Sequence, residues 1–529
     1  MPTPISLAVA ALARTGALTR AWRLLTEQGS DTLASDPALL ALKGRLLKDL
    51  GGRTGDDERR QYYLQASQAY QASAQLHPAS YPAINAASLS LLGGRNALAA
   101  KLAQNILNYL DSNREEPETP YYRAATRAEA LLLLDRDGEA QEAFAEAVAL
   151  APEAWEDHAS TLRQFALILE AQGKDAAWLE PHRPPKSLHF GGHMSFDARV
   201  ARRQHLDNRI AEVLAEERVH FGFGALAAGA DIIIAEALLD RGAEVHAVLP
   251  GGPDAFAAAS VDPFGKGWRR RYDAVLKQAA SVRIVGPEGL TPDATIVAVA
   301  DEVAMGMAVM NARRLESRAL QLLVLPAEES AAKDEPAHAH ARWAEAGWRQ
   351  RILTAPREAP LEDAPGLPAA AHERLAVLVI APGAAEGADA RLRQIATELG
   401  KGPPPRLPPF FNGREAVTAY AEAADAAQAA TGVARAFGEE SEVAVGGYYG
   451  VVDPVEDPFS GQRRPGGDAV PLASAAAASA PPGTVLVSAD FAAALAASGA
   501  AGFHLELVGE LEARDGGAPV DLYGISARL

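Results

Sequence analysis

The fold of the middle of the chain is decided by residues 222–252, which read GFGALAAGADIIIAEALLDRGAEVHAVLPGG. A glycine-rich turn runs into an apolar helix expected at 229–241, and a strand is expected at 244–249. The alternation continues outward in both directions, with further strands expected at 187–190, 219–223 and 282–285 and a last strand at 320–325. Short loops between alternating strands and helices predict a parallel sheet with helices on both faces, a Rossmann-like α/β region.

Glycine-rich segments follow two of these strands, where an open parallel sheet binds its ligands. FGGHM (190–194) ends the first strand, and Gly222, Gly224 and Gly229 surround the end of the second. Glycine lets the backbone turn tightly and approach a ligand, and free backbone N–H groups at helix N-termini favour phosphate. The spacing does not match the dinucleotide fingerprint, so the glycines predict a phosphate-type site and no particular cofactor.

Residues 187–325 resemble the SLOG superfamily of nucleotide-binding Rossmannoid domains. The resemblance is carried by the helix start AAGAD…AE, in which Glu236 closes the motif, and by the PGG at 250–252 that ends a strand. It implies that the glycine loops hold the phosphates and sugar of a nucleotide. The binding residues expected from the glycines and the resemblance are Gly191, Gly192, His193, Met194, Gly222, Gly224, Ala225, Gly229, Ala230, Asp231, Glu236, Pro250, Gly251 and Gly252.

The same resemblance bears on catalysis. Hydrolytic members of the superfamily carry PGGxGTxxE, whereas this chain reads PGGPDAFAAAS from Pro250, so the Gly-Thr and the Glu are missing. This predicts binding without turnover, with a nucleotide N-glycosidase or phosphoribohydrolase as the alternative. Asp231 is expected either to contact a ligand or to stabilise its helix as a first-turn acid. Glu236 is either a ligand contact or part of a solvated helix face.

The histidines and arginines of the middle region predict no metal site. His189 and His193 are four residues apart, but they lie on a strand and on the turn after it, which separates them. His338 and His340 are expected to be solvated in a polar loop that leaves the sheet. The run Arg269–Arg271 is expected either to clamp a phosphate or to form a solvated basic helix face.

Residues 1–184 are predicted to form a domain of paired helices. Segments 66–94 and 126–155 repeat a pattern of helix, turn and helix, with alanine at close-contact positions. The pattern resembles tetratricopeptide repeats (TPR), and YPAINAASLSLLGG (81–94) resembles the TRAF-binding-domain family of helical repeats. The resemblance implies a surface that docks a partner protein, with a helical scaffold that has no ligand of its own as the alternative.

Residues 373–529 resemble the catalytic domain of class III adenylate and guanylate cyclases, an α+β fold with a ferredoxin-like core. The clearest match is 447–495, where a DP loop, the approach from Gly467 to Val470, PPG and the strand VLVS keep the family's distances. Active cyclases use two aspartates to hold two metal ions at the triphosphate. Their helix also supplies an Asn that orients the ribose and an Arg that stabilises the transition state.

These catalytic positions are degenerate here. The stretch that follows Glu373 and Arg374, LAVLVIAPGAA, contains no acid where the first metal aspartate is expected. The other degenerate positions are Arg414 and Glu415 in the central hairpin and Pro471 and Ala475 in the helix. The sequence therefore predicts a pseudo-cyclase that contributes dimerisation or regulation, with residual cyclase activity through an acid such as Glu415 as the alternative.

Composition and charge limit the classes of partner. The chain has 529 residues, a net charge of −18 and no cysteine, which argues against nucleic-acid binding, disulfides and thiolate metal sites. The apolar N-terminal stretch is interrupted at Arg14 and is expected to be an amphipathic helix rather than a signal peptide, and no window is expected to span a membrane. The domains are expected at 1–184, 185–354 and 373–529, with a linker at 355–372.

Together these patterns predict a multidomain cytoplasmic signalling or sensor protein. The expected ligand is a nucleotide or a nucleotide-derived second messenger at the SLOG-like domain, and no metal is expected. The helical repeats are expected to dock a protein partner, and the cyclase-like domain to form a homodimer without turnover. The resemblances point to bacterial stress or immunity signalling, and a pure scaffold protein is the remaining alternative.

Overall fold

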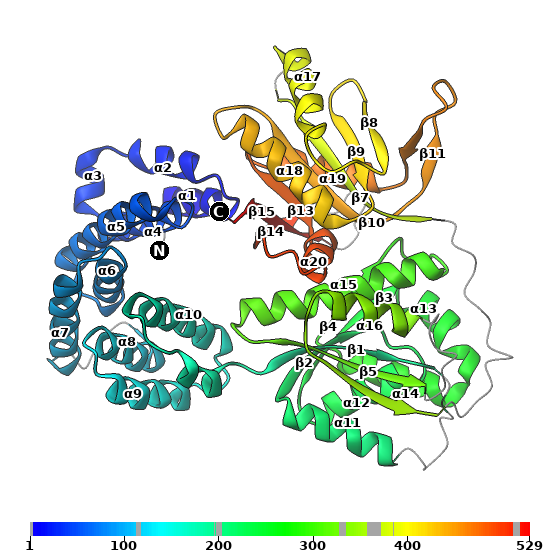
Figure 1. The fold of residues 1–529 in the computed structure, drawn as a ribbon, viewed down its shortest axis with the longest axis horizontal. Coiled ribbons are helices and arrows are strands. Elements are labelled where there is room, and N and C mark those ends of the chain that lie inside the picture. The colour runs from blue at the N-terminus through cyan, green and yellow to red at the C-terminus, as the bar shows by residue number, and fades with distance from the viewer. Residues whose placement is uncertain are drawn as a thin grey trace. The chain divides into compact units, whose positions relative to one another are not determined.

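The structure is a computed structural model that describes residues 4–112, 118–194, 196, 204–326, 335–356, 372–383, 386–511 and 519–528 (Figure 1). Most of the predicted linker at 355–372 lies outside these residues. The chain divides into two compact units at Pro184 and Pro185, apart from a few residues at 314–316 and at the C-terminal end. The first unit is helical, and the second contains both large sheets.

The helical unit packs its helices as successive antiparallel pairs, drawn blue to cyan in Figure 1. Small residues allow close approach, since a Cβ added to Gly44 would lie 2.6 Å from the Tyr70 ring. Asp36 caps its helix by accepting from the backbone N–H groups of Ala38 and Leu39. The helices are α1 (Pro4–Arg14), α2 (Leu18–Thr26), α3 (Ser30–Ser35), α4 (Pro37–Gly51), α5 (Asp56–Leu76), α6 (Ser80–Leu92), α7 (Asn96–Ser112), α8 (Pro120–Leu133), α9 (Asp137–Leu150), α10 (Trp155–Gln172) and the 3-10 helix η1 (Ala177–His182).

The first sheet, sheet A, is parallel throughout and has the strand order β4-β3-β2-β1-β5-β6. The predicted parallel sheet is therefore confirmed. Its strands are β1 (Lys186–Gly192), β2 (Val219–Gly224), β3 (Glu244–Pro250), β4 (Ser281–Val285), β5 (Ala319–Pro326) and β6 (Gln350–Ala355). The helices are α11 (Gln204–Glu216), α12 (Ala230–Leu239), α13 (Pro253–Ser260), α14 (Lys266–Gln278), α15 (Ala294–Arg314) and α16 (Glu335–Glu345), with the 3-10 helix η3 (Asp262–Phe264).

Two expectations for the end of sheet A are wrong. The segment 326–343, expected to be a polar loop, contains the start of α16, which buries Ala339 and Trp343 one turn apart. His340 therefore lies on a helix and is partly buried, while the side chain of His338 lies outside the described part of the chain. The strand at 320–325 is not the last, because β6 follows it at the sheet edge.

The second sheet, sheet B, is mixed, with the order β14-β15-β13-β10-β7-β9-β8. Its pairs are antiparallel except for β10 with β13. Its elements are β7 (Glu373–Ala381), α17 (Ala388–Leu399), β8 (Leu407–Phe411), β9 (Ala416–Tyr420), α18 (Ala423–Phe437), β10 (Ala444–Val452), α19 (Ala469–Ser479), β13 (Val485–Ser488), α20 (Ala489–Ala497), β14 (Phe503–Leu511) and β15 (Val520–Ala527).

Two segments rich in proline and glycine, a composition that predicts loops, contain strands. KGPPPRLPPFFNG (401–413) includes β8, whose prolines are tolerated because β8 is an edge strand. The segment 451–468 begins with the end of β10 and then forms a hairpin of β11 (Pro454–Glu456) and β12 (Arg463–Pro465).

Helix α15 lies between the two sheets and joins them in one core. Its buried residues Val299, Ala300, Val303 and Ala304 share a hydrophobic cluster with strand residues of both sheets. A Cβ added to Gly306 would lie 1.9 Å from the backbone oxygen of Ala493 in α20, so the two helix backbones are in direct contact.

The composition of α15 follows from this position. By length and hydropathy α15 could cross a membrane, but 56% of its apolar window is buried inside the protein. A helix that is apolar on all sides is also what burial between two layers requires. Its one buried acid, Glu302, forms ion pairs with Arg342 and Arg374 inside the unit.

Candidate functional site

The order of the strands in sheet A places β1 at a topological switch point. Strands β2, β3 and β4 follow on one side of β1, and β5 and β6 lie on the other. In such sheets the crevice for a ligand lies outside the carboxyl ends of the strands where the order reverses. The carboxyl end of β1 is Gly191 and Gly192, followed by His193 and Met194, so four of the expected residues lie at this point.

The start of α12 packs directly against this end of β1. Gly229 precedes the helix with φ +112°, a conformation that favours glycine. A Cβ added there would lie 2.8 Å from the backbone oxygen of His193, and one added to Gly192 would lie 2.6 Å from the Cβ of Ala230. The backbone N–H of Ala230 donates to the His193 oxygen at 3.3 Å. The two predicted glycine segments are therefore brought together.

Asp231 lies in the first turn of α12 and points back toward β1. Its side chain accepts from the backbone N–H of Ala227 at 3.2 Å, and the residue is only 7% exposed. Burial raises the pKa of Asp231 to about 8, against the opposing hydrogen bond from Ala227, and the nearby Asp301 carboxylate adds to the rise. At neutral pH most Asp231 side chains are protonated, and the group can donate a hydrogen bond without repelling an anion.

A buried polar chain lies beneath the same strand end. The His189 ring on β1 is completely buried, with Nε2 3.0 Å from the Asp301 carboxylate of α15 and Nδ1 3.0 Å from the side chain of Gln321 on β5. The ring also stacks on Trp343 of α16. Asp301, at 24% exposure, connects this chain to the surface near Asp231.

The sequence reasoning missed Asp301 and Gln321. A polar residue inside the apolar strand ALQLLVLP was a signal for Gln321, because an uncompensated amide is costly in a core. Asp301 interrupts the apolar helix α15, but nothing in the sequence indicates that it contacts β1. Within the described residues no group of three or more His, Asp or Glu side chains could hold a metal ion.

Other expected residues have packing roles in the structure. A Cβ added to Gly222 would lie 2.3 Å from Leu238, one at Gly224 would lie 2.6 Å from the Phe190 oxygen, and one at Gly251 would lie 2.1 Å from the Leu290 oxygen. These glycines let strands, helices and loops approach each other. Gly191 differs, because its nearest neighbours are 3.7 Å and 3.8 Å away, the latter being the Asp231 carboxyl. Of the remaining positions, Ala225 follows β2, Pro250 ends β3 and Gly252 precedes α13.

The charged residues named beside the site are engaged within the protein. Glu236 forms a paired contact with Arg271, whose guanidinium also lies 4.4 Å from the Trp268 ring. Arg269 forms ion pairs with Asp262 and Asp273. The structure therefore gives Glu236 a partner instead of a solvated face, and it gives two of the three arginines protein partners.

In sheet B the degenerate positions lie around one carboxylate. Arg414 and Glu415 lie in the turn between β8 and β9, and the Glu415 carboxylate accepts from Ser474 of α19 at 3.0 Å. Asn412 donates to the same carboxylate at 3.2 Å. The same α19 carries Pro471, which is exposed, and Ala475, which is partly buried.

Comparison with known families covers the N-terminal part of the chain. Residues 5–90 match the family model Tetratricopeptide Repeats-Sensor (TPR-S). The prediction of TPR-like repeats is confirmed for this region. No curated protein sequence matches the chain.

Among solved structures the chain is similar to several cyclases. Adenylate cyclases from Trypanosoma brucei are 16% identical, with a TM-score of 0.26, over 31% of this chain and 95% of theirs. The catalytic core of a rhodopsin-guanylyl cyclase is 14% identical, with a TM-score of 0.24, over 30% of this chain and 98% of its own. The adenylyl cyclase CyaB from P. aeruginosa is 17% identical, with a TM-score of 0.23, over 29% of this chain and 94% of its own.

Proposed function

We propose that this chain is a cytoplasmic sensor protein that binds a nucleotide or a nucleotide-derived second messenger at the carboxyl end of β1. The observation that carries the proposal is the meeting at the switch point of sheet A of Gly191, where a Cβ would make only ordinary contacts, with the buried Asp231, whose pKa is raised to about 8. A neutral carboxyl beside backbone N–H groups suits a ligand that presents both hydroxyl groups and phosphate. The SLOG resemblance gives the same class of ligand.

The other regions have supporting roles in this proposal. The helical repeats dock a protein partner, and the cyclase-like region forms a homodimer or regulates output without turnover. The Glu415 carboxylate is held by Ser474 and Asn412, and no second acid accompanies it at the expected strand position on β7. An assay with ATP or GTP and Mn²⁺ that yields cyclic product would instead establish an active cyclase.

Helix α15 connects the proposed ligand site to sheet B. Asp301 contacts His189 below the site, while its neighbour Glu302 contacts Arg374 and Tyr449 of sheet B. Two consecutive residues of α15, about 100° apart around the helix, thus contact the two sheets. A ligand that moves Asp301 would therefore also move Glu302 and its contacts with the cyclase-like region.

Mass spectrometry of ligands retained after gentle purification tests the proposal, together with thermal shift against a panel of nucleotides, including cyclic and ADP-ribose-derived ones. A bound ligand stabilises the folded state by RT ln(1 + [L]/Kd), so a true ligand raises the Tm with concentration. Gly191→Val places a branched side chain in the site. Because valine is well tolerated in a β-strand, β1 should still form, and the ligand-dependent rise in Tm should disappear.

Gly432→Val is the matched control, because Gly432 has no neighbour within 4 Å and lies on α18, far along the chain. The ligand-dependent shift should persist in this variant. The proposal fails if no nucleotide is retained and none raises the Tm of the unmodified protein.

A further inference from the structure

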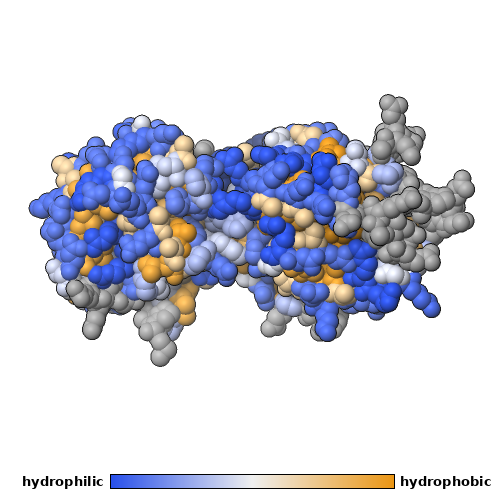
Figure 2. Space-filling model, turned by 90° about the horizontal axis from the view of Figure 1, so that it is seen from below, coloured by the Kyte–Doolittle hydropathy of each residue, from blue (hydrophilic) through white to orange (hydrophobic). Residues whose placement is uncertain are grey.

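Two cavities of the helical unit open along the same helix, α5. The first, of about 410 Å³, lies between α2, α4 and α5, and the second, of about 540 Å³, lies between α5 and the start of α7. The face of the molecule drawn in Figure 2 carries hydrophobic patches between hydrophilic side chains. Both cavities are lined in part by residues of α5, so they lie along the same helix.

A row of glutamines connects the two cavities. Residues three or four apart share a helix face, and α5 carries glutamine at five positions with this spacing. Two of them line the first cavity and the next two line the second. Within the described part of the chain only one makes a side-chain hydrogen bond, to Ser67 at 3.1 Å. The five glutamines are Gln61, Gln65, Gln68, Gln71 and Gln75, and Gln71 makes the hydrogen bond to Ser67.

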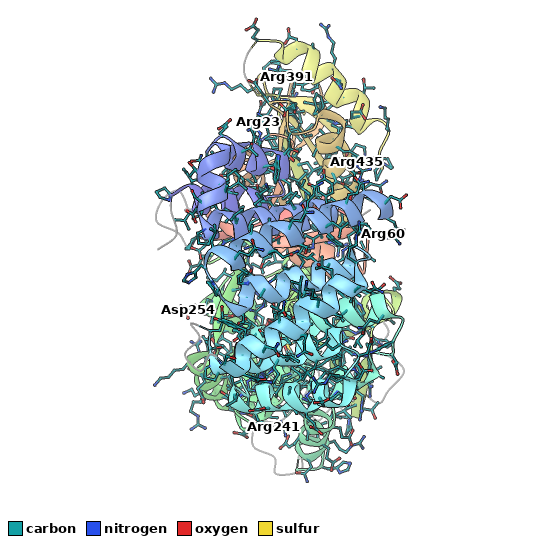
Figure 3. The ribbon with its side chains drawn as sticks, turned by 90° about the vertical axis from the view of Figure 1, so that its left-hand side faces the viewer. Arg23, Arg60, Arg241, Asp254, Arg391 and Arg435 are labelled. Atoms are coloured by element: carbon teal, nitrogen blue, oxygen red, sulfur yellow. The ribbon has the colours of Figure 1, made fainter. Side chains whose placement is uncertain are left out.

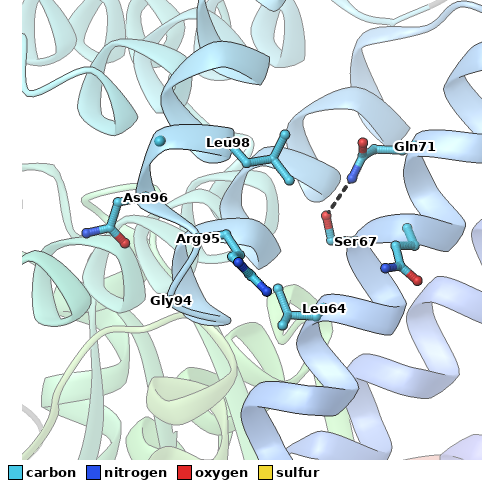
Figure 4. Close-up of a pocket in the computed structure, with 9 residues that line it drawn as sticks. Leu64, Ser67, Gln71, Gly94, Arg95, Asn96 and Leu98 are labelled. Atoms are coloured by element: carbon cyan, nitrogen blue, oxygen red, sulfur yellow. Dashed lines mark hydrogen bonds between the residues drawn. The ribbon is translucent and has the colours of Figure 1, made fainter.

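Each cavity also has apolar walls. The first is lined by Trp22, Leu47, Leu50 and Tyr62, with a buried leucine among them. In the second, Leu64 of α5 lies beside Arg95, and Leu98 of α7, 37% exposed, points toward α5 (Figure 4). Such cavities suit a bound peptide whose aliphatic side chains enter the apolar cavities while the glutamine amides form hydrogen bonds with its backbone.

The spacing of the cavities selects the conformation of that chain. Their glutamine pairs are centred about six to seven residues apart on α5, which is about 10 Å along the helix axis. An extended chain of the polyproline II type places residues i and i+3 on one side about 9 Å apart, and its carbonyl groups are free. Glutamine side chains can donate to those carbonyls and accept from the N–H groups.

The charges at the two ends give the chain a direction. Near the first cavity, Asp56 and Asp57 pair with Arg59 and Arg60, the latter at the surface in Figure 3. Glu58, which lines the first cavity, forms no ion pair with a described residue. At the other end Arg95 lines the second cavity, and its side chain likewise forms no ion pair within the described residues.

We propose that this face of α5 binds an extended peptide segment of a partner protein. The segment has two aliphatic residues three positions apart, a basic residue on the side of Glu58 and an acidic residue on the side of Arg95. This inference rests on the proposed docking role of the helical repeats and names the surface and the chemistry of the partner. It does not depend on nucleotide binding at β1.

Fluorescence anisotropy with the full chain tests the proposal. The probe is a fluorescein-labelled peptide with the order lysine, leucine, serine, proline, leucine, aspartate, and the comparison peptide exchanges its lysine and aspartate. The first peptide should bind and the second should bind about tenfold more weakly, as expected for two misplaced charges at about 0.7 kcal/mol each. Gln65→Ala with Gln68→Ala should weaken the probe about tenfold, through two lost hydrogen bonds. Gln141→Ala, on an exposed position of α9, should leave binding unchanged.

The double variant Glu58→Arg with Arg95→Glu separates a change in peptide specificity from a loss of binding caused by misfolding. This variant should prefer the comparison peptide, a gain that a misfolded protein cannot show. The proposal is overturned if the probe does not bind, if the glutamine variant retains its affinity, or if the charge exchange fails to invert the preference. A nucleotide-dependent Tm shift measured on the same sample separates this failure from a failure at β1.

Discussion

The two sheets of the second unit use their acidic side chains differently. In sheet A, Asp231 is buried with a raised pKa, and it lies beside Gly191 at the switch point, where a Cβ would fit with ordinary contacts. In sheet B, Glu415 lies partly exposed in a hairpin turn, and α19 beside it consists mainly of small apolar residues. A buried polar group is costly to keep, whereas an alanine helix costs little. Under the proposed function, sheet A binds the ligand and sheet B has a packing role, and this difference between the two sheets can be tested.

The strongest test of this difference asks whether the two sheets unfold together. Glu302→Ala removes a carboxylate, 3% exposed, that pairs with Arg342 and Arg374. Two partly buried guanidinium groups and the buried Tyr449 hydroxyl then lose a partner, and the free energy of unfolding should fall by about 4 kcal/mol. Urea denaturation should show one transition that shifts as a whole. Two separate transitions, with only one displaced, would contradict a shared core around α15.

The next test uses the protonation of Asp231. Because burial raises the pKa of Asp231 to about 8 from an ordinary 3.8, the folded protein holds a proton that the unfolded chain has released. Stability from this group is present below about pH 4 and is lost as the pH rises toward 8, by about 3 kcal/mol between pH 5 and pH 7. Asp231→Asn mimics the protonated form and should be flatter over that range.

Chemical denaturation at pH 5, 6 and 7 measures this slope for both proteins. Asp254→Asn is the matched control, because Asp254 is fully exposed at the start of α13. An equal pH dependence of the unmodified protein and Asp231→Asn would show that Asp231 is ionised in the fold.

The sequence predicted strands β1 to β5 of sheet A because alternation and glycine turns are local signals, but it missed α16 and β6. It could not predict that α15 is shared by both sheets, since an all-apolar helix has the same pattern in a core and in a bilayer. The glycine positions were found, but Gly191 and Gly224 look alike in sequence. Only the nearest neighbours of a Cβ, at 3.7 Å for Gly191 and 2.6 Å for Gly224, distinguish a position that has room for a methyl group from one that has none. Asp301 reaches the site from α15, and it lies 70 residues after Asp231 in the chain.

A smaller effect should separate these two kinds of glycine. Gly224→Ala forces a Cβ to within 2.6 Å of the Phe190 backbone oxygen, so it should lower the free energy of unfolding by about 2 kcal/mol. Gly191→Ala meets only ordinary contacts and should change it by less than about 0.5 kcal/mol. Urea titrations of the two variants give the comparison directly. Equal losses would mean that Gly191 is as tightly packed as Gly224, and the site at β1 would have no open position.

The smallest effect is expected at Glu415 in sheet B. Its carboxylate is partly exposed and accepts hydrogen bonds from Ser474 and Asn412 that an amide oxygen can also accept. Glu415→Gln should therefore change the free energy of unfolding by less than about 0.5 kcal/mol. Nucleotide-dependent Tm shifts should also be unchanged, because the proposed ligand site lies in sheet A. If Glu415→Gln abolished those shifts while Gly191→Val preserved them, the ligand would bind the cyclase-like region, and the roles assigned to the two sheets would be reversed.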